Sequence, residues 1–426
     1  MASARSGPQV LLLSHSDAGG AGRAAYRLLR GLRAQGVRAQ MAALESVTGD
    51  PAVQRPRTRF GRVTSRMRSS VDRLPLALAM RAPRPMFSPA WLPERLAHRV
   101  RQSAPEVVHL HWVSGGMLRI ESLARLGRPL IWTMHDMWTF TGGCHYDDGC
   151  GRYVEACGRC PVLGSSRQAD LSRWVMRRKR RAWRAVPITL VAPSRWLAEQ
   201  ASASSLFRDR PVRVIPNGLD LERFQPVDPG LARRLLGLPP DRSYLLFGAL
   251  DPGGERRKGL GLLQAALQRL AGSGWGDRLD LLVVGAMAPA VPLDLRLRTH
   301  FLGALRDELS MALALAAADV VVVPSTQENL PNMAVEAFAC GRPCVGFAVG
   351  GLPDIVEDGA SGRLAPPFDT GELAAAIAWV VQDEGRRRAL GRAARRKAEQ
   401  TFDLRLVARR YVDLYAEVLD GMRRSS

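Results

Sequence analysis

The chain has 426 residues, of which 46% are hydrophobic, so it is long enough for two or three domains with full cores. No apolar stretch reaches the roughly 18–20 residues of a membrane-spanning helix, and the run 10–13 is too short for a signal-peptide core, so we expect a cytoplasmic protein. The formal net charge of +21 indicates a polyanionic partner: a membrane surface, a nucleic acid or a phosphorylated substrate.

The first half of the chain alternates between strand and helix patterns, as a parallel sheet with crossover helices would. We predict strands at 10–14, 37–44, 107–110, 130–134 and 189–192, and helices at 22–35 and 117–126. Residues 50–100 do not fit this alternation. Seven prolines interleaved with arginines predict an irregular basic insertion there.

The second half starts a new alternation after a turn-rich segment at 215–230, which has the composition of a hinge. We predict strands at 244–248, 279–284, 299–302, 320–323 and 344–347, and helices at 259–270, 309–317 and 333–340. A last helix is expected at about 404–419. The two alternations predict two α/β domains.

Glu328 and Glu336 follow the apolar run 320–323, on the expected strand-to-helix loop and on the first turns of the following helix. In an open parallel sheet this loop lies at the carboxyl end of the strand, where ligands bind, and the helix start offers free N–H groups to phosphate. The two carboxylates could hold sugar or ribose hydroxyls by charge-assisted hydrogen bonds. Two glutamates in a surface loop would otherwise be unremarkable.

Lys258 ends a basic loop between a predicted strand and a predicted helix in the same half. A diphosphate in a partly dehydrated site needs counter-charge, which lysine and arginine can supply. His135 follows the buried strand 130–134, and Gly19 and Gly20 lie in the first strand-to-helix loop, where backbone can approach a phosphate or an acceptor. A structural histidine and a simple glycine turn are the alternatives.

Four of the six cysteines lie within residues 144–160: Cys144, Cys150, Cys157 and Cys160. Cys157 and Cys160 have C-x2-C spacing, which is typical of a zinc site, with Cys144 and Cys150 as a second arm and His145 as a replacement ligand. The spacing of the second arm is wider than usual. A structural zinc, a disulfide or redox pair, and unliganded thiols are therefore all open.

Residues 167–184 combine an apolar stripe that includes Trp174 and Trp183 with a run of arginines. This pattern is typical of a helix in an anionic membrane interface. A surface helix that docks its tryptophans on the core would show the same pattern.

These features occur in an order that resembles a known family. The segments SDAGGAGRAAYRLLRGL, His135-Asp136, VAPSRWL, VIPNGLDLERF, ERRKGLGLLQAAL and AVEAFACGRPCVGFAVGGLPDIVEDGASGRL, together with the spacing of Glu328 and Glu336, resemble retaining glycosyltransferases of family 4. The resemblance implies the GT-B fold, with two facing Rossmann-like domains of parallel sheets. It predicts an acceptor-side domain at 1–220, a nucleotide-sugar donor domain at 221–403 and a crossover helix at 404–426 packing on the first domain.

The resemblance also assigns roles to residues. It implies catalytic roles for His135, Lys258 and Glu328, with Lys258 on the donor phosphates and His135 against the transferred sugar. The expected donor-binding residues are Gly19, Gly20, Asn217, Arg257, Lys258, Asn329, Leu330, Asn332 and Glu336. Arg257 or Arg256 stands in for an arginine that family members place several residues before the lysine. The stretch 329–332 departs from the family's Phe-Gly-Leu, which could alter the choice of donor.

The implied function is transfer of a sugar from a UDP-, GDP- or ADP-sugar to a carbohydrate or lipid-linked hydroxyl, with retention of configuration. The resemblance points to bacterial exopolysaccharide, capsule, lipopolysaccharide or glycolipid synthesis, at the inner face of the plasma membrane or in the cytoplasm. Because no D-x-D element lies where it could place a metal on the diphosphate, we expect transfer to need no metal cofactor. A nucleotide-sugar epimerase of the same fold and a basic nucleic-acid-binding protein are the alternatives. The sequence does not identify the sugar, the base or the acceptor.

Overall fold

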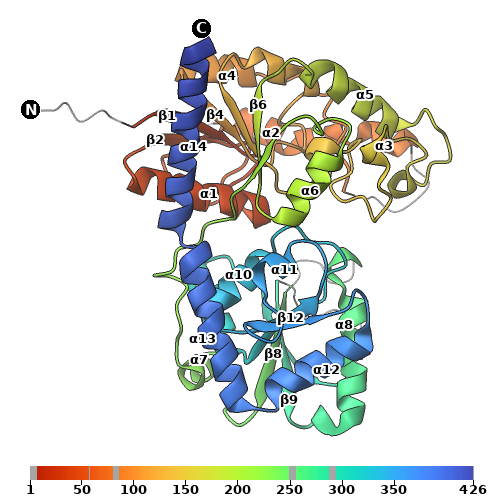
Figure 1. The fold of residues 1–426 in the computed structure, drawn as a ribbon, viewed down its shortest axis with the longest axis vertical. Helices are drawn as coiled ribbons and strands as arrows, with labels where there is room; N and C mark the ends of the chain where they lie inside the picture. The colour runs from red at the N-terminus through yellow and green to blue at the C-terminus, as the bar shows by residue number, and fades with distance from the viewer. Residues whose placement is uncertain are drawn as a thin grey trace, which may run out of the picture. The chain divides into compact units, whose positions relative to one another are not determined.

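The computed structural model describes residues 7–56, 58–79, 86–248, 256–285, 287 and 294–425. The chain divides into two compact units (Figure 1). Unit 1 comprises residues 1–218 and 405–426, and unit 2 comprises residues 219–404. Each unit is built around one parallel sheet, so the predicted pair of Rossmann-like α/β domains is confirmed.

Unit 1 contains a seven-stranded sheet in the order β3-β2-β1-β4-β5-β6-β7, and all its strand pairs are parallel. Its strands are β1 (Gln9–Leu13), β2 (Arg38–Ala42), β3 (Val53–Gln54), β4 (Val107–Leu110), β5 (Leu130–Thr133), β6 (Ile188–Ala192) and β7 (Val212–Val214). Strands β4 and β5 are buried along their whole length, as expected for a parallel sheet covered on both faces.

The helices of unit 1 cover both faces of this sheet. They are α1 (Gly19–Ala34), α2 (Arg59–Asp72), α3 (Leu74–Ala79), α4 (Leu96–Ser103), α5 (Leu171–Trp183), α6 (Arg195–Ala203) and the part of α14 (Leu404–Ser425) that belongs to this unit, with short 3-10 turns η1 (Ile120–Arg125), η2 (Met137–Phe140), η3 (Arg152–Val154) and η4 (Pro161–Leu163). One hydrophobic cluster joins α1 and α14 to one sheet face, and another joins α5, α6 and the 3-10 turns to the opposite face. The predicted return of the last helix to the first domain is therefore confirmed.

Residues 50–100 differ from the expected irregular insertion, because α2, α3 and α4 are regular helices there. Helix α2 has apolar residues at helical spacing, Phe60, Val63 and Met67, but they are exposed, and only Ser65 and Asp72 of its 14 residues are buried. Thr58 caps α2 by accepting a hydrogen bond from the backbone N–H of Gly61. Part of the predicted insertion lies outside the described residues. The helix expected at 117–126 is only the 3-10 turn η1.

Unit 2 contains a six-stranded parallel sheet in the order β10-β9-β8-β11-β12-β13. Its strands are β8 (Ser243–Gly248), β9 (Leu279–Val284), β10 (Arg298–Gly303), β11 (Val320–Val323), β12 (Cys344–Phe347) and β13 (Gly362–Ala365). Its helices are α7 (Pro229–Leu235), α8 (Leu260–Leu270), α9 (Glu308–Ala317), α10 (Asn332–Ala339), α11 (Leu352–Ile355), α12 (Thr370–Val381) and α13 (Glu384–Thr401), with the short turns η5 (Arg256–Lys258) and η6 (Ala271–Trp275). Helices α9, α10 and α13 pack on one face, and α8 and α12 pack on the other.

Aspartates fix the starts of four helices in unit 2. Side-chain oxygens of Asp228, Asp307, Asp369 and Asp383 accept hydrogen bonds from backbone N–H groups in the first turn of α7, α9, α12 and α13, respectively. Across the described part of the chain, no helix combines the length and the apolar character that crossing a membrane requires.

Candidate functional site

A carboxylate in the loop between β11 and α10 forms a cluster with two cations of η5. Arg257 Nη1 donates a hydrogen bond to Glu328 Oε2 and a second one, of 2.8 Å, to the carbonyl oxygen of Gln327. Lys258 Nζ lies 3.3 Å from Oε1 and 3.2 Å from Oε2 of Glu328. The structure thus brings Arg257, Lys258 and Glu328 together at the carboxyl end of β11.

Two glycines allow this cluster to form. Gly259 has a φ of +73°, and a Cβ atom there would lie 1.8 Å from the carbonyl oxygen of Pro324. Gly350 has a φ of +58°, and a Cβ atom there would lie 1.9 Å from the carbonyl oxygen of Glu328. Both positions accept only glycine without rearrangement. The close contacts fix η5 and the turn before α11 against the loop that holds Glu328.

The charge of Glu328 is set by its two neighbours. Burial raises the pKa of this carboxyl, while Lys258 and Arg257 lower it, and the net pKa is below the usual value for glutamate. Glu328 is 8% exposed, so it is a buried anion held by two cations. With Glu328 ionised, the three side chains carry one net positive charge.

The start of α10 lies next in the chain. No side chain caps this end of the helix, and Pro331 occupies the N-cap position. Asn329 and Leu330, in the loop before α10, are buried, and Glu336 in its second turn is 2% exposed. Asn332 is the first helical residue. The backbone N–H groups of a helix start favour negative charge, so this end of α10 suits a phosphate.

His135 in unit 1 belongs to a row of three histidines. His135 Nε2 lies 2.9 Å from His111 Nδ1, and the rings of His111 and His109 are 4.3 Å apart. His109 contacts the hydroxyl of Tyr415 in α14 and that of Thr133 in β5, each at 2.8 Å. Burial lowers the pKa of His135 to about 4 and that of His109 to about 3, so these imidazoles are neutral near pH 7.

His109 and His111 were not among the predicted site residues. Both lie in the segment VVHLHW, where histidine alternates with an apolar residue at the end of a buried strand. Residues two apart in extended chain lie on the same side, so this alternation brings His109 in β4 and His111 just after it together and could have identified them.

Asp136, the residue after His135, contacts a further histidine, His145. Asp136 Oδ2 lies 2.6 Å from His145 Nδ1 and accepts a hydrogen bond of 2.7 Å from Trp112 Nε1. His145 Nε2 contacts the hydroxyl of Ser88 at 2.9 Å. Both ring nitrogens of His145 are therefore engaged, which contradicts its predicted role as a replacement metal ligand.

The glycine segment differs slightly from its prediction. Gly19 and Gly20 are the first residues of α1 and do not lie in the preceding loop. Gly19 has a φ of +70°, a conformation that favours glycine. Asp17 ties the preceding loop to the segment after β2 by accepting hydrogen bonds from the side chains of Ser46 and Thr48. Asn217 lies after β7, beside the point where the chain passes between the units.

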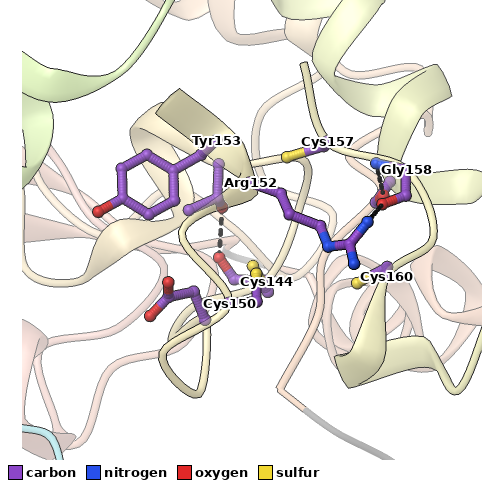
Figure 2. A pocket seen from close by; sticks show the side chains of 10 residues that line it. Cys144, Cys150, Arg152, Tyr153, Cys157, Gly158 and Cys160 are labelled. Carbon is purple, nitrogen blue, oxygen red and sulfur yellow. Dashed lines mark hydrogen bonds between the residues drawn. The ribbon is translucent and has the colours of Figure 1, made fainter. Parts of the chain in front are cut away.

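The four clustered cysteines line one small pocket of about 10 Å³, room for about one water molecule (Figure 2). Arg152 crosses the pocket in Figure 2 and donates a hydrogen bond of 3.3 Å to the carbonyl oxygen of Gly158. All six cysteines of the chain are free thiols. Among the described residues, no group of three or more His, Cys, Asp or Glu side chains is arranged to hold a metal ion, so the structure gives the predicted zinc site no support.

The basic helix α5 is docked on the core of unit 1. Val175, Met176 and Trp183 are buried in the hydrophobic cluster, and only Trp174 is substantially exposed. Arg178 covers Trp174 at 4.3 Å from the ring centroid and forms an ion pair with Glu121. The apolar stripe is therefore not available to a lipid surface, and the predicted membrane contact through 167–184 is not supported.

Two family descriptions together cover most of the chain. Residues 18–223 match "Glycosyltransferase Family 4", and residues 241–383 match "Glycosyl transferases group 1". A D-inositol 3-phosphate glycosyltransferase from Xylanimonas cellulosilytica is 32% identical over 333 residues, which are 73% of this chain and 72% of that protein. The chain therefore belongs to the family 4 glycosyltransferases.

One further protein is similar to half of the chain, and another is similar to nearly all of it. The D-inositol 3-phosphate glycosyltransferase of Saccharomonospora viridis is 36% identical over 227 residues, which span 50% of this chain and only about half, 51%, of that relative. The crystal structure of Anabaena HepE in complex with UDP-glucose is similar with a TM-score of 0.66 and 19% identity, over 97% of this chain and 100% of that chain. The latter similarity supports the GT-B fold, and neither alternative function is favoured by these comparisons.

Proposed function

We propose that the protein transfers a sugar from a nucleotide diphosphate sugar to a hydroxyl acceptor, with retention of the anomeric configuration. The observation that carries this proposal is the cluster of Arg257, Lys258 and Glu328 beside the start of α10. The proposal places the donor in unit 2, at the carboxyl ends of β11 and β12.

Charge balance supports a diphosphate at this place. The cluster carries one net positive charge, and the start of α10 adds the partial positive charge of a helix N-terminus. Glu328 neutralises one of the two cations. A diphosphate of charge about −2 would supply the negative charge that balances the remaining cation and the helix start. Lys258 has the more accessible side chain, 25% exposed against 15% for Arg257, so we assign it to the departing phosphate.

The remaining assignments follow from hydrogen-bonding capacity. Glu336 would accept hydrogen bonds from ribose hydroxyls, and Glu328 would accept them from the transferred sugar. Backbone amides at Asn329, Leu330 and Asn332 would meet the sugar or the phosphate. His135, kept neutral, would contact the transferred sugar from unit 1, where Gly19, Gly20 and Asn217 would also serve binding.

Retention follows in this proposal from attack on the same face that the leaving group occupies. The leaving phosphate accepts the proton of the acceptor hydroxyl, while Lys258, Arg257 and the helix start stabilise the negative charge that develops on it. Glu328 is engaged by two cations and is therefore poorly suited to act as a nucleophile. The proposed acceptor is a carbohydrate or a lipid-linked sugar.

Ligand-induced stabilisation tests the donor site. The purified chain is heated with UDP, GDP, ADP and their common sugars, beginning with UDP-glucose, the ligand of HepE. A ligand at 100 times its dissociation constant should add about 2.7 kcal/mol to the free energy of unfolding. We expect stabilisation by one nucleotide family that disappears in Lys258→Ala and Glu336→Ala.

Arg256→Ala is the matched control, because Arg256 lies in the same turn but has an exposed side chain. It should keep the full shift, whereas equal losses in all three variants would indicate a general effect of charge. Absence of any shift at low salt would overturn the proposed donor site. Retention is tested separately by NMR of the sugar released by slow hydrolysis of the donor, since the first anomer formed reports the face of attack.

A further inference from the structure

A large pocket in unit 2 lies at the end of the sheet opposite the end that carries the Glu328 loop. Its volume is about 760 Å³, and α7, α13 and the segments just before β11 and β12 line it. Asp319 directly precedes β11, whereas Glu328 follows this strand. Because the strands are parallel, the pocket lies at their amino ends and the proposed donor site lies at their carboxyl ends. A ligand in the pocket would therefore not occupy the donor site.

The pocket is strongly basic. Seven arginines and three carboxylates line it, which gives a net charge of +4. Helix α13, which runs beside α7 and α10 in Figure 1, supplies five of the arginines: Arg387, Arg388, Arg392, Arg395 and Arg396. A concave surface concentrates this charge more than a convex one would.

Part of this charge is neutralised inside the protein. Asp319 forms ion pairs with Arg233 at 2.8 Å and with Arg387 at 3.2 Å, and these three side chains are largely buried. Arg342 lines the same pocket and donates a hydrogen bond of 3.2 Å to the carbonyl oxygen of Val227. One carboxylate thus pairs with two guanidinium groups.

Two of the remaining arginines have no counterpart among the described residues. Arg392 and Arg396 are exposed, lie one helical turn apart on the same face of α13, and make no hydrogen bond or ion pair with another described residue. The buried Nε of Arg342 has no acceptor among the described groups. Arg395, by contrast, pairs with Glu399 at 2.7 Å. The pocket therefore offers two free guanidinium groups and one unpaired buried N–H.

We propose that this pocket binds a ligand carrying two or more phosphate groups. The planar guanidinium group matches phosphate oxygens in a bidentate way, and several of them converge here around a volume within the ordinary range for a small-molecule site. Like charges at Arg392 and Arg396 repel each other until an anion lies between them. The phosphates could belong to a soluble oligophosphate or to an anionic lipid headgroup.

Calorimetric titration of the purified chain with tripolyphosphate tests this site at 0.15 M salt. The variant is Arg392→Ala/Arg396→Ala, whose side chains are exposed and unpaired, so the fold should be retained. The matched control is Arg409→Ala/Arg410→Ala, which removes the same charge from exposed positions of α14 outside the pocket. We expect at least a tenfold loss of affinity in the first variant and less than a twofold change in the control.

Three outcomes would overturn the proposal. These are no binding to the wild-type chain, equal losses in both variants, or displacement of tripolyphosphate by UDP together with loss of binding in Lys258→Ala. The last result would place the phosphate in the proposed donor site. Failure of every nucleotide to bind would leave this test unaffected, so the two proposals can fail independently.

Vesicles distinguish the two sources of phosphate. Sedimentation is measured with vesicles that contain cardiolipin, whose headgroup carries two phosphates, and phosphatidylcholine vesicles serve as the control without net charge. Binding that tripolyphosphate displaces and that Arg392→Ala/Arg396→Ala abolishes would assign the pocket to a lipid headgroup. Tripolyphosphate binding without vesicle binding would assign it to a soluble oligophosphate. Both results support the phosphate site and differ only in its natural ligand.

Discussion

Glu328 holds together two parts of unit 2 through different atoms. Its carboxylate accepts hydrogen bonds from Arg257 and Lys258, and its backbone carbonyl accepts one of 3.0 Å from the N–H of Gly351. The same residue therefore orients the cations of η5 and the turn that begins α11. A substitution here changes the resting geometry of the proposed donor site as well as any direct contact with a sugar.

Glu328→Gln should destabilise the protein by roughly 2–4 kcal/mol, because it leaves two partly buried cations without their anion. Urea unfolding at pH 7 measures the loss. Glu417→Gln is the control, since it removes the carboxylate of an exposed pair with Arg213 and should change stability by less than about 1 kcal/mol. Equal effects in the two variants would mean that the Glu328 cluster contributes no more than a surface ion pair.

The histidines of unit 1 should make stability depend on pH. Burial lowers the pKa of His135 to about 4 and that of His109 to about 3, while the unfolded chain titrates near 6.5. Between these values the unfolded state binds more protons, so stability is complete above pH 6.5 and falls as the pH drops toward 4. We expect a loss of at least about 2 kcal/mol between pH 7.5 and 4.5 by urea unfolding.

His109→Asn should flatten this pH dependence, even if the variant is less stable at every pH. His98→Asn, at an exposed position on α4, should leave the slope as it is in the wild type. A slope that is unchanged in His109→Asn would show that the buried histidines do not set the acid sensitivity.

At the scale of the elements, alanine substitutions at Gly259 and Gly261 can be compared directly, because the two glycines lie two residues apart at the start of α8. An alanine Cβ at position 259 would collide with the carbonyl oxygen of Pro324, whereas one at position 261 meets nothing within 4 Å. Gly259→Ala should therefore cost about 2 kcal/mol or more. Gly261→Ala should stabilise the helix by about 0.5–1 kcal/mol.

Thermal and urea unfolding of the two alanine variants give this comparison directly. Gly259→Ala should also weaken the stabilisation by the donor, because its clash displaces the turn that presents Arg257 and Lys258. If both variants behave alike, the close approach of η5 to Pro324 does not hold in solution.

The cysteine segment should react slowly with thiol reagents. Burial raises the pKa of Cys157 to about 12 and that of Cys160 to about 11, so few thiolates exist at pH 8. We expect slow reaction of the native chain with a chromogenic disulfide, and rapid reaction of all six thiols after unfolding in denaturant with a chelator. Fewer than six thiols would indicate a disulfide, and zinc released during unfolding would contradict the absence of a metal-binding arrangement in the described residues.

The sequence predicts helices and strands well where buried positions produce a regular pattern of apolar residues. Four consecutive valines, all buried, identify β11, and the helix expected at 333–340 is α10, Asn332–Ala339. It fails for α2, where Phe60, Val63 and Met67 have helical spacing but lie among the arginines and prolines that predict an irregular segment. At the site, the local spacing predicts that Glu328 and Lys258 belong to strand-end loops. It does not predict the hydrogen bond between Arg257 and Glu328, because that contact joins two chain segments about 70 residues apart.

For the whole molecule, the chain returns to its first unit after completing the second. Helix α14 follows α13 in sequence, yet Tyr411 and Tyr415 are buried against the sheet of unit 1. Tyr415 contacts Nδ1 of His109 in the row that includes His135. The last residues of the chain are therefore part of the support of the first unit, an arrangement that the family resemblance predicts and local sequence patterns alone do not.

Tyr415→Ala should thus loosen unit 1 and spare unit 2. The substitution removes a fully buried aromatic ring and its contact with His109, which should cost about 3–5 kcal/mol. Hydrogen exchange measured by mass spectrometry should show lost protection in peptides from β1 and β4 and wild-type protection in peptides from β8 and β11. Arg409→Ala, an exposed change on the same helix, should alter neither set. Equal loss in both sets would show that the two units unfold as one cooperative body, because the damage would then not be confined to the unit that α14 completes.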